Sequence, residues 1–318
     1  MSIRIITESS SDIEQSMAKE LDITVLPIHL HIGNEDYIDG FTLSKSRFYE
    51  LLIEEDALPK TSQITPYEYE QATDTDDECI IITIASELSG CYRNACFASE
   101  GKHNVHVIDS RSACLGQGLL VKRAVQLRDE GKTCQEIVDI LEKEKSHVRI
   151  IALMNTLEYL KKGGRISAVA YAAGSLLGIK PVISIEDGQI ITVGKARGSR
   201  SGNNMLVSQI DKYGGIDFSR PFALGYSGLS SAKLDKYIKD SSALYEGKTD
   251  NLPITQIGPT IGTYAGEDAI ALAWFDNQQE KIATVRRMAK KNMPISDIAE
   301  FTDLSTDEVQ KILNTIAK

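Results

Sequence analysis

The chain has 318 residues, of which 42% are hydrophobic and 25% are charged, proportions typical of a globular protein long enough for two domains. Its formal net charge of −10 argues against a nucleic-acid partner, because phosphate binding depends on clustered Lys and Arg side chains. The N-terminus lacks the pattern of a signal peptide, and no apolar stretch approaches the roughly 20 residues of a membrane span, so we expect a soluble, cytoplasmic protein.

The first half of the chain alternates between predicted strands and predicted helices. The strands are residues 3–7, 24–32, 80–84 and 105–109, and the helices are residues 12–21, a segment from about residue 90, and residues 116–129. This alternation predicts a parallel sheet covered by helices. Ligands of open α/β sheets collect at the carboxyl ends of strands. We therefore expect the polar segments that follow three of these strands to meet at one edge: residues 9–11, 86–90 and 109–110.

From about residue 149 the pattern becomes that of an α+β domain with antiparallel strands. An Asp187-Gly188 pair between two β-rich arms predicts a hairpin over residues 183–193. The other expected elements are strands at residues 222–226, 254–257 and 269–275 and a helix at residues 230–239. We therefore expect an α/β domain over residues 1–150 and an α+β domain over residues 151–275. Residues 58–66 should lie between these domains, where clefts often bind ligands.

Residues 276–318 are predicted to form a separate group of three helices, which resembles a helix-turn-helix. The helices are expected at residues 280–292, 296–301 and from 304 to about 316. Seven Lys or Arg residues are balanced by seven Asp or Glu residues, and the would-be recognition helix begins Thr306-Asp307-Glu308. Because DNA-reading helices present a basic face, an appendage for packing or dimer contacts is favoured over a DNA-binding unit.

Cysteine and histidine usage gives little indication of a metal site. The five cysteines are odd in number and lack C-x-x-C spacing, so free thiols are predicted. His29 and His31 alternate on a predicted strand and share a face. Because no third ligand is evident in the sequence, a structural or solvent-facing pair is favoured over a metal site.

Two short polar segments carry small hydroxyl side chains at the ends of apolar runs. Residues 59–63 include Thr61 and Ser62, and residues 87–92 include Ser89 and Gly90. Hydroxyls donate hydrogen bonds, and glycine lets backbone N–H groups approach a ligand oxygen, which suits a carboxylate or a phosphate. For either segment alone, ordinary turn and helix-capping chemistry is the simpler explanation.

Three further motifs occur with these segments in a distinctive order. They are TESSSD at residues 7–12, LEYLKKGGRIS at residues 157–167 and IGPTIG at residues 257–262. Together the five segments, spread over about residues 3–275, resemble the DegV family of bacterial lipid-binding proteins, some of which are fatty-acid-binding subunits of a fatty acid kinase. The resemblance implies the two-domain DegV-like (EDD) fold, a long-chain fatty acid as the ligand and no cofactor.

The resemblance also implies roles for individual residues. Thr61, Ser62 and the Ser89-Gly90 pair match positions that hold the fatty acid carboxylate at one end of an apolar tunnel. Arg165 and Arg197 match basic positions near the pocket mouth, where relatives dock the kinase or assist acyl-phosphate transfer, and guanidinium groups suit phosphate recognition. For each arginine, a surface ion pair is the plainer explanation.

The sequence departs from the family pattern at two places. Cys91 stands where relatives usually carry Thr, which removes a strong hydrogen-bond donor. Tyr264 stands where relatives carry a head-group His, and Glu267 and Asp268 follow it. A phenol donates one hydrogen bond and stays neutral near pH 7, whereas nearby acids would repel a carboxylate. We therefore expect the affinity or the identity of the ligand to differ.

The resulting hypothesis is a fatty acid carrier that presents its ligand to a separate kinase. No G-x-x-x-x-G-K-[ST] phosphate loop and no G-x-S-x-G nucleophile elbow occurs in the sequence, which favours a non-catalytic role. One alternative is a hydrolase or transferase with Ser89 or Cys91 as nucleophile and His29 or His31 as base. Another is a lipid-responsive regulator that acts through the helical tail.

Overall fold

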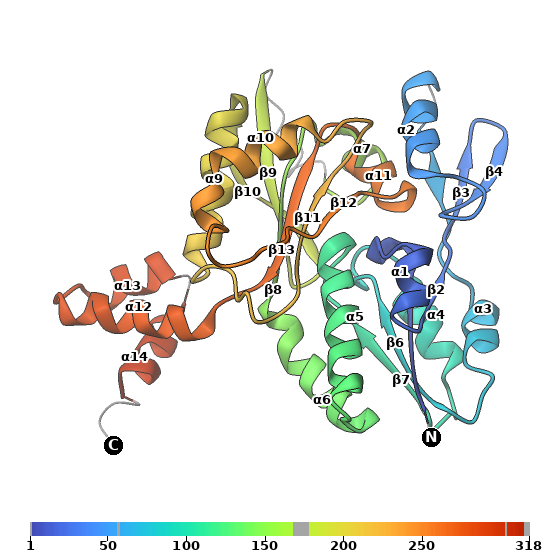
Figure 1. Cartoon of the computed structure of the whole chain (residues 1–318), viewed down its shortest axis with the longest axis horizontal. Helices are drawn as coiled ribbons and strands as arrows, with labels where there is room; N and C mark the ends of the chain where they lie inside the picture. Colours follow the sequence, from blue (N-terminus) through green and yellow to red (C-terminus); the bar gives the residue numbers. More distant parts are fainter. Residues whose placement is uncertain (1, 56–57, 168–177, 303, 315–318) are drawn as a thin grey trace.

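The structure is a computed structural model that describes residues 2–55, 58–167, 178–302 and 304–314 (Figure 1). Its described strands form three sheets of four, six and three strands. The long helix α5 (Cys114–Asp129) lies between the two larger sheets, and three C-terminal helices project away from them (Figure 1). The fold is the predicted α/β arrangement with a parallel sheet, antiparallel strands and a helical tail.

The four-stranded sheet is parallel throughout, as the sequence predicts. Its strands are β1 (Ile3–Glu8), β2 (Ile23–Leu26), β6 (Glu78–Thr83) and β7 (Val105–Asp109), in the order β2-β1-β6-β7. The central strand β6 is almost entirely buried, as expected for a strand that is covered by helices on both faces. The carboxyl ends of β1, β6 and β7 therefore lie at one edge.

The prediction of a single strand over residues 24–32 is wrong, because Pro27 interrupts it. Proline has no backbone N–H for a sheet ladder, so β2 ends at Leu26. The chain then enters β3 (His29–Ile32), which pairs with β4 (Glu35–Ile38) and β5 (Lys60–Thr61) in an antiparallel three-stranded sheet. Thr61 is thereby held on a strand. His29 and His31 share the exposed face of β3, as predicted.

The predicted helix over residues 12–21 is shorter than expected. A 3₁₀ turn at Ser9–Ser11 is ended by Asp12, whose φ of 56° is left-handed, and α1 (Gln15–Glu20) begins only after it. Asp is one of the few residues that adopts this conformation readily. The turn places the Asp12 side chain in the protein interior.

The six-stranded sheet is mostly antiparallel. Its strands are β8 (Val148–Leu153), β9 (Ile179–Glu186), β10 (Gln189–Arg197), β11 (Phe222–Tyr226), β12 (Ile254–Gln256) and β13 (Ile270–Phe275), in the order β10-β9-β8-β13-β11-β12. Only the β11–β12 pairing is parallel. The predicted hairpin is confirmed, since Asp187 and Gly188 join β9 to β10 with φ of 47° and 82°, as a two-residue turn requires.

Helix α5 packs between the parallel four-stranded sheet and the six-stranded sheet. It contacts β1 and β6 on one side and β8, β11 and β13 on the other, and its residues are buried on nearly every side. A helix that is buried on most of its faces belongs in a core. Gly118 is required here, because a Cβ would lie 2.6 Å from the Ser11 carbonyl oxygen. One continuous hydrophobic core therefore joins both sheets.

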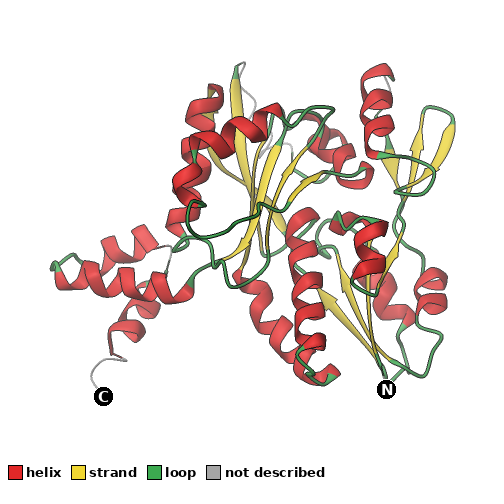
Figure 2. Ribbon diagram, viewed as in Figure 1, coloured by secondary structure: helices red, strands yellow, loops and turns green. Residues whose placement is uncertain are grey.

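The other helices cover the sheets (Figure 2). They are α2 (Lys45–Glu54), α3 (Pro66–Ala72), α4 (Cys91–Ala98), α6 (Cys134–Glu144), α7 (Glu158–Lys162), α9 (Gly198–Lys212), α10 (Ala232–Asp240) and α11 (Pro259–Ala265). Helices α4 and α10 match the predictions, whereas the other six are found only in the structure.

Within the described residues, no helix is both long enough and apolar enough to cross a membrane. All five cysteines are free thiols, as predicted.

The C-terminal tail forms three helices close to the predicted positions. They are α12 (Gln278–Lys290), α13 (Ile295–Thr302) and α14 (Thr306–Asn314). The helices pack around a small core of Val285, Ile298, Ala299 and Val309. The predicted end of the last helix near residue 316 lies outside the described residues.

Candidate functional site

A cavity of about 420 Å³ lies beside the carboxyl end of the parallel sheet. Aliphatic side chains from β8, β9, β10 and β13 form one part of its wall, and the other lining residues come from the segments at the ends of β2, β5, β6 and β8, the start of α5 and the regions of α7 and α11. The polar side chains in the lining are Thr61, Ser62, Gln63, Ser89, Arg165, Ser184, Thr260 and Tyr264. A site of this size with an apolar wall and a few polar groups suits a small amphipathic ligand.

Six of the seven predicted ligand-binding residues line this cavity. They are Thr61, Ser62, Ser89, Gly90, Arg165 and Tyr264. Arg197 is the exception, because it is exposed at the last position of β10 and is not among the described residues of the lining. Three further polar residues of the lining, Gln63, Ser184 and Thr260, are not among the predicted site residues. Whether the predicted residues bind a ligand stays a prediction.

The predicted meeting of the strand ends is confirmed by hydrogen bonds between the loops. Ser86, after β6, donates to Asp109 at the end of β7 through its backbone N–H at 3.3 Å and its hydroxyl at 2.6 Å. The backbone N–H of Ile84 donates to Glu8 at the end of β1 at 3.1 Å. These bonds fix the loop that carries Ser89 relative to the sheet.

Thr61 and Tyr264 form a hydroxyl pair on the cavity wall. The Thr61 Oγ1 atom on β5 lies 2.6 Å from the Tyr264 hydroxyl on α11, and both side chains are half-buried. Each hydroxyl carries one proton. One of these two protons forms the bond between them, so the pair retains one O–H that is available to a ligand.

The Tyr264 ring is held between Arg165 and Gly163. The Arg165 guanidinium carbon lies 4.7 Å from the ring centroid, a distance typical of cation–π contacts. A Cβ on Gly163 would lie 2.5 Å from the ring, so only glycine leaves room for it. Arg165 also donates to the backbone oxygens of Leu88 at 3.2 Å and Gly163 at 2.6 Å. The arginine thus places a positive charge beside the hydroxyl pair.

Ser89 and Gly90 lie directly before α4. The Ser89 hydroxyl donates to Cys91 Sγ at 3.2 Å and accepts from the Cys91 backbone N–H at 3.3 Å. Gly90 has an ordinary φ of −77°, so backbone strain does not require a glycine. A Cβ at this position would lie 1.8 Å from Gln63 Oε1, because the Gln63 side chain covers Gly90. Gln63 is therefore a polar lining residue for which the sequence analysis assigns no role.

Within the described residues, the side chains named for the hydrolase or transferase alternative do not form a nucleophile–base pair. Cys91 is fully buried, and burial raises the pKa of its thiol to about 12, whereas a nucleophilic cysteine must be a thiolate. His29 and His31 are paired with acids, at 3.7 Å from Glu68 and 2.8 Å from Asp36. Among the described residues that line the cavity there is no histidine.

Two buried carboxylates hold the start of α11, the helix that carries Tyr264. Asp39 accepts from the Thr260 backbone N–H at 3.1 Å and from its hydroxyl at 2.5 Å, and Asp12 accepts from the Gly258 backbone N–H at 2.6 Å. Burial raises the pKa of both carboxyls, that of Asp39 to about 6. This arrangement was not predictable from the sequence, because nothing in the order of residues pairs Asp39 with Thr260.

A third buried carboxylate, Glu8, connects the loops behind the cavity. It accepts hydrogen bonds from Tyr69 at 2.5 Å, Gln117 at 2.6 Å and Ser10 at 3.2 Å. Burial is the main cause of the raised pKa of Glu8. These donors come from α3, α5 and the turn after β1. The network therefore holds α3 and α5 against the end of β1, next to the polar loops that follow the strands.

The acids that follow Tyr264 lie away from the cavity. Asp268 is exposed and forms an ion pair with Lys233 at 2.5 Å. Neither Glu267 nor Asp268 is among the described residues of the lining. The Lys233 ammonium partly offsets the negative charge of Asp268, and the expected effect of the two acids on ligand affinity stays a prediction.

Comparisons with known proteins give a consistent assignment. A model of the DegV family, described as an uncharacterised protein family, matches residues 2–277. A DegV domain-containing protein from Caldanaerobacter subterraneus is 32% identical over 275 residues, which cover 84% of this chain and 96% of that relative. The family model ends just before α12, so the three tail helices α12, α13 and α14 lie outside the matched residues.

Two solved structures have the same fold. A DegV family protein from Thermus thermophilus, described by its fatty acid binding, gives a TM-score of 0.78 at 24% identity and covers 87% of this chain and 100% of that one. The fatty acid kinase B3 protein of Streptococcus pneumoniae, loaded with linoleic acid, gives a TM-score of 0.75 at 21% identity and covers 87% and 100%. At these identities the likeness establishes a shared fold.

Proposed function

Because the chain belongs to the DegV family, we propose that it binds a long-chain fatty acid, with the acyl chain in the cavity and the carboxylate at its polar side chains. The observation that carries the proposal is the cavity itself, which combines a mostly aliphatic wall with uncharged donors and one arginine. The two structural neighbours described above are a fatty acid binder and a protein loaded with linoleic acid.

The acyl chain supplies most of the binding free energy in this proposal. Transfer of a methylene group from water into an apolar site is favourable by about 0.8 kcal/mol, so a long chain gains several kcal/mol from the aliphatic wall. That wall includes Ile28, Ile84, Ile150, Ile151, Ile183, Ile185, Ile190, Ile257 and Ile261. Branched side chains on strands are stiff, which favours a preformed cavity.

The carboxylate is received by hydroxyl groups whose present hydrogen bonds are weak or incomplete. The Thr61 and Tyr264 pair retains one O–H. The Ser62 hydroxyl makes a long bond of 3.4 Å to a backbone oxygen, and the Ser89 hydroxyl donates to a thiol, a weak acceptor. A carboxylate forms stronger, charge-assisted bonds with such donors. The nearby Arg165 guanidinium lowers the cost of bringing a negative charge to Gly90 and its neighbours.

The proposal extends to presentation of the bound acid to a separate fatty acid kinase that forms the acyl phosphate. It is supported by the structural likeness to a fatty acid kinase B3 protein and by the lack of a phosphate-loop motif in this sequence. Arg165 beside the cavity and the exposed Arg197 are the residues proposed to contact the kinase or the transferred phosphate. Residues 1–150 would supply the head-group loops and residues 151–275 the rest of the cleft.

The first experiment is native mass spectrometry of the full chain purified from a bacterial host. We expect a stoichiometric small molecule that denaturation releases and that chemical analysis identifies as a fatty acid. The double variant Thr61→Ala with Ser89→Ala should lose it. The exposed pair Thr24→Ala with Ser230→Ala serves as the matched control. An empty protein that also refuses added fatty acids would reject the proposal.

Two further assays separate the carrier from its alternatives. With a fatty acid kinase catalytic subunit and ATP, the loaded protein should yield acyl phosphate, and Arg165→Ala should lower the yield. An intrinsic esterase or transferase activity that disappears in Ser89→Ala or Cys91→Ala would instead support the enzyme alternative. Esterase or transferase activity that survives in both variants would not depend on Ser89 or Cys91 as the nucleophile.

A further inference from the structure

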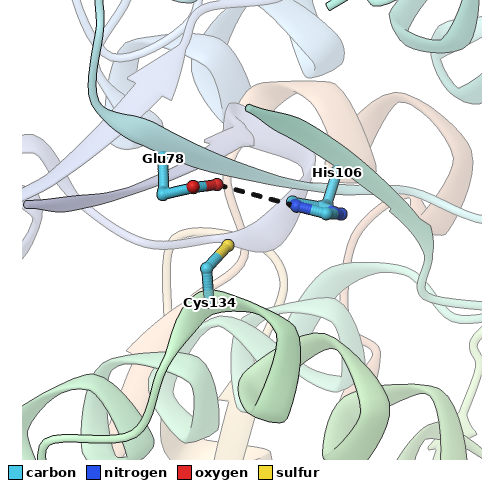
Figure 3. Close-up of side chains that lie close together, drawn as sticks. All are labelled: Glu78, His106 and Cys134. Carbon is cyan, nitrogen blue, oxygen red and sulfur yellow. Dashed lines mark ion pairs between the residues drawn. The ribbon is translucent and has the colours of Figure 1, made fainter. Parts of the chain in front are cut away.

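Three side chains with metal-binding atoms meet at the end of the parallel sheet opposite the cavity. Glu78 is the first residue of β6, His106 the second residue of β7, and Cys134 the first residue of α6 (Figure 3). The cavity lies at the other end of β6, where Ile84 and Ser89 follow the strand. The cluster is therefore separate from the proposed fatty acid site.

The strand register brings Glu78 and His106 to one face of the sheet. Ile80 pairs with His106 in the parallel β6–β7 ladder, and Glu78 lies two residues before Ile80, so its side chain points to the same side. Helix α6 packs on β6 and β7. Its start is fixed by a capping box of Thr133 and Glu136, which places the Cys134 thiol above the two strands.

The three ligand atoms are close together and point towards one another. The Glu78 carboxylate, a His106 ring nitrogen and Cys134 Sγ all lie within 4.8 Å of one another, and Glu78 Oε2 is 3.7 Å from His106 Nε2 (Figure 3). The Glu78 and His106 side chains are 32% and 26% exposed, whereas Cys134 is 8% exposed. An ion from solvent therefore has access to a thiol that is otherwise shielded.

We propose that Glu78, His106 and Cys134 bind a zinc ion, with water in the fourth position. Zinc accepts sulfur, nitrogen and oxygen ligands in one tetrahedral site, whereas magnesium and calcium require oxygen ligands alone. Atoms bound at about 2.0–2.3 Å to one ion lie roughly 3.5 Å apart. The observed separations, none above 4.8 Å, are only slightly longer than that.

The charges of the cluster balance those of the ion. A thiolate and a carboxylate contribute two negative charges, and a neutral imidazole contributes none, so a Zn²⁺ complex is neutral. Binding transfers the Cys134 thiol proton to solvent, together with the imidazolium proton when His106 is protonated, and replaces the Glu78–His106 contact. The described residues supply three ligands, and three protein ligands leave one position to water. The ion would join α6 to β6 and β7 and so stabilise this edge of the sheet.

The test uses Co²⁺ and Zn²⁺ with the full chain after treatment with a chelator. We expect one Co²⁺ per chain, with the visible absorption of tetrahedral Co²⁺ and a thiolate-to-metal charge-transfer band that Zn²⁺ abolishes by displacement. Cys134→Ser should remove the charge-transfer band, and His106→Ala and Glu78→Gln should each weaken Zn²⁺ binding at least tenfold. The controls Cys96→Ser and His103→Ala remove the same chemical groups outside the cluster and should bind normally.

Thermal unfolding provides a second readout, because a ligand that binds the folded state raises its stability. Zn²⁺ should raise the midpoint temperature of thermal unfolding for the wild-type chain and for both controls. It should leave the midpoint temperature of Cys134→Ser unchanged. Absence of stoichiometric binding, or equal Zn²⁺ affinity in wild type and Cys134→Ser, would overturn the proposal. If Cys134→Ser does not fold, His106→Ala decides by the same criteria. Fatty acid occupancy should be unaffected by these substitutions, so this result is independent of the proposed function.

Discussion

The hydroxyl of Tyr264 lies 2.6 Å from that of Thr61, although the two residues are 203 positions apart in the chain. The bond joins β5, in the three-stranded sheet, to α11, which follows β12 of the six-stranded sheet in the chain. A tyrosine at this position thus forms part of the polar wall of the cavity. Because the two hydroxyls share one hydrogen bond, we expect their contributions to the proposed ligand binding to be coupled.

Substitutions in this pair should have a non-additive effect on fatty acid binding. Thr61→Val and Tyr264→Phe each leave one O–H for the carboxylate, whereas the double variant leaves none. We expect the single changes to raise the dissociation constant less than about fivefold. The double change should raise it by roughly 10- to 100-fold, since a hydrogen bond to a charged group contributes about 1.5–3 kcal/mol.

Isothermal titration with a defined fatty acid measures these constants. Tyr67→Phe, which alters an exposed tyrosine on α3, is the matched control and should bind like wild type. Equal and additive effects of the two single changes would mean that the hydroxyls act independently of each other. An unchanged affinity in the double variant would remove the pair from the carboxylate site.

Gly163→Ala should destabilise the protein through the Tyr264 ring. Gly163 has an ordinary φ of −74°, so alanine is compatible with the backbone, but its Cβ would lie 2.5 Å from the ring. Overpacking of this kind costs about 1–3 kcal/mol. We expect that loss in the wild-type background and less than half of it in a Tyr264→Ala background. Urea unfolding of wild type, Gly163→Ala, Tyr264→Ala and the double variant gives the coupling free energy between the two positions. An equal loss of unfolding free energy in both backgrounds would assign the cost to backbone contacts.

Deletion of residues 278–318 should leave fatty acid affinity within about twofold of wild type. The family model ends at residue 277, the helices of the tail have their own small core, and the described cavity lining includes no tail residue. Affinity measured on the deleted and full-length chains tests this. Salt-dependent DNA binding by the full chain that the deletion removes would support the regulator alternative instead.

Much of the fold was predictable because long β-branched runs leave few alternatives. Strand β7 matches its predicted residues 105–109, and the Asp187-Gly188 hairpin has the expected turn. Short elements were missed, since β5 has two residues and no periodicity can be read from so short a segment. The break at Pro27 was readable from the sequence in principle, as were the capping boxes of α3 and α6.

Five of the eight polar side chains that line the cavity were named from the sequence, whereas Gln63, Ser184 and Thr260 were not, nor were the contacts between them. Hydroxyls after strand ends are visible in the sequence, and the DegV resemblance selects among them. The cover of Gly90 by Gln63, the room that Gly163 leaves for Tyr264 and the bond from Thr260 to Asp39 all depend on tertiary contacts. Glu78, His106 and Cys134 are likewise spread over 57 positions, without the short spacing that indicates a metal site.

Asp39→Asn should stabilise the protein increasingly as the pH rises. Burial raises the pKa of Asp39 from the ordinary 3.8 to about 6, so the folded state holds a proton that the unfolded state releases at a lower pH. The contribution of this carboxyl to stability is therefore fully present below pH 3.8 and is lost as the pH rises through about 6. Asparagine keeps an oxygen that can accept from Thr260 but does not ionise.

The difference in unfolding free energy between Asp39→Asn and wild type should consequently shift in favour of the variant by roughly 2.4 kcal/mol between pH 4 and pH 7, because each pKa unit corresponds to about 1.36 kcal/mol and part of the effect of Asp39 already appears below pH 4. Urea unfolding of both proteins at four pH values measures it, and carboxyls common to both, such as Glu8, largely cancel in the difference. A difference that does not vary with pH would show that Asp39 ionises normally in the folded protein. Asp39 holds Thr260 on the cavity wall. Ionisation of the Asp39 carboxyl should therefore also change the fatty acid affinity of the wild type with pH, and Asp39→Asn should lack this contribution.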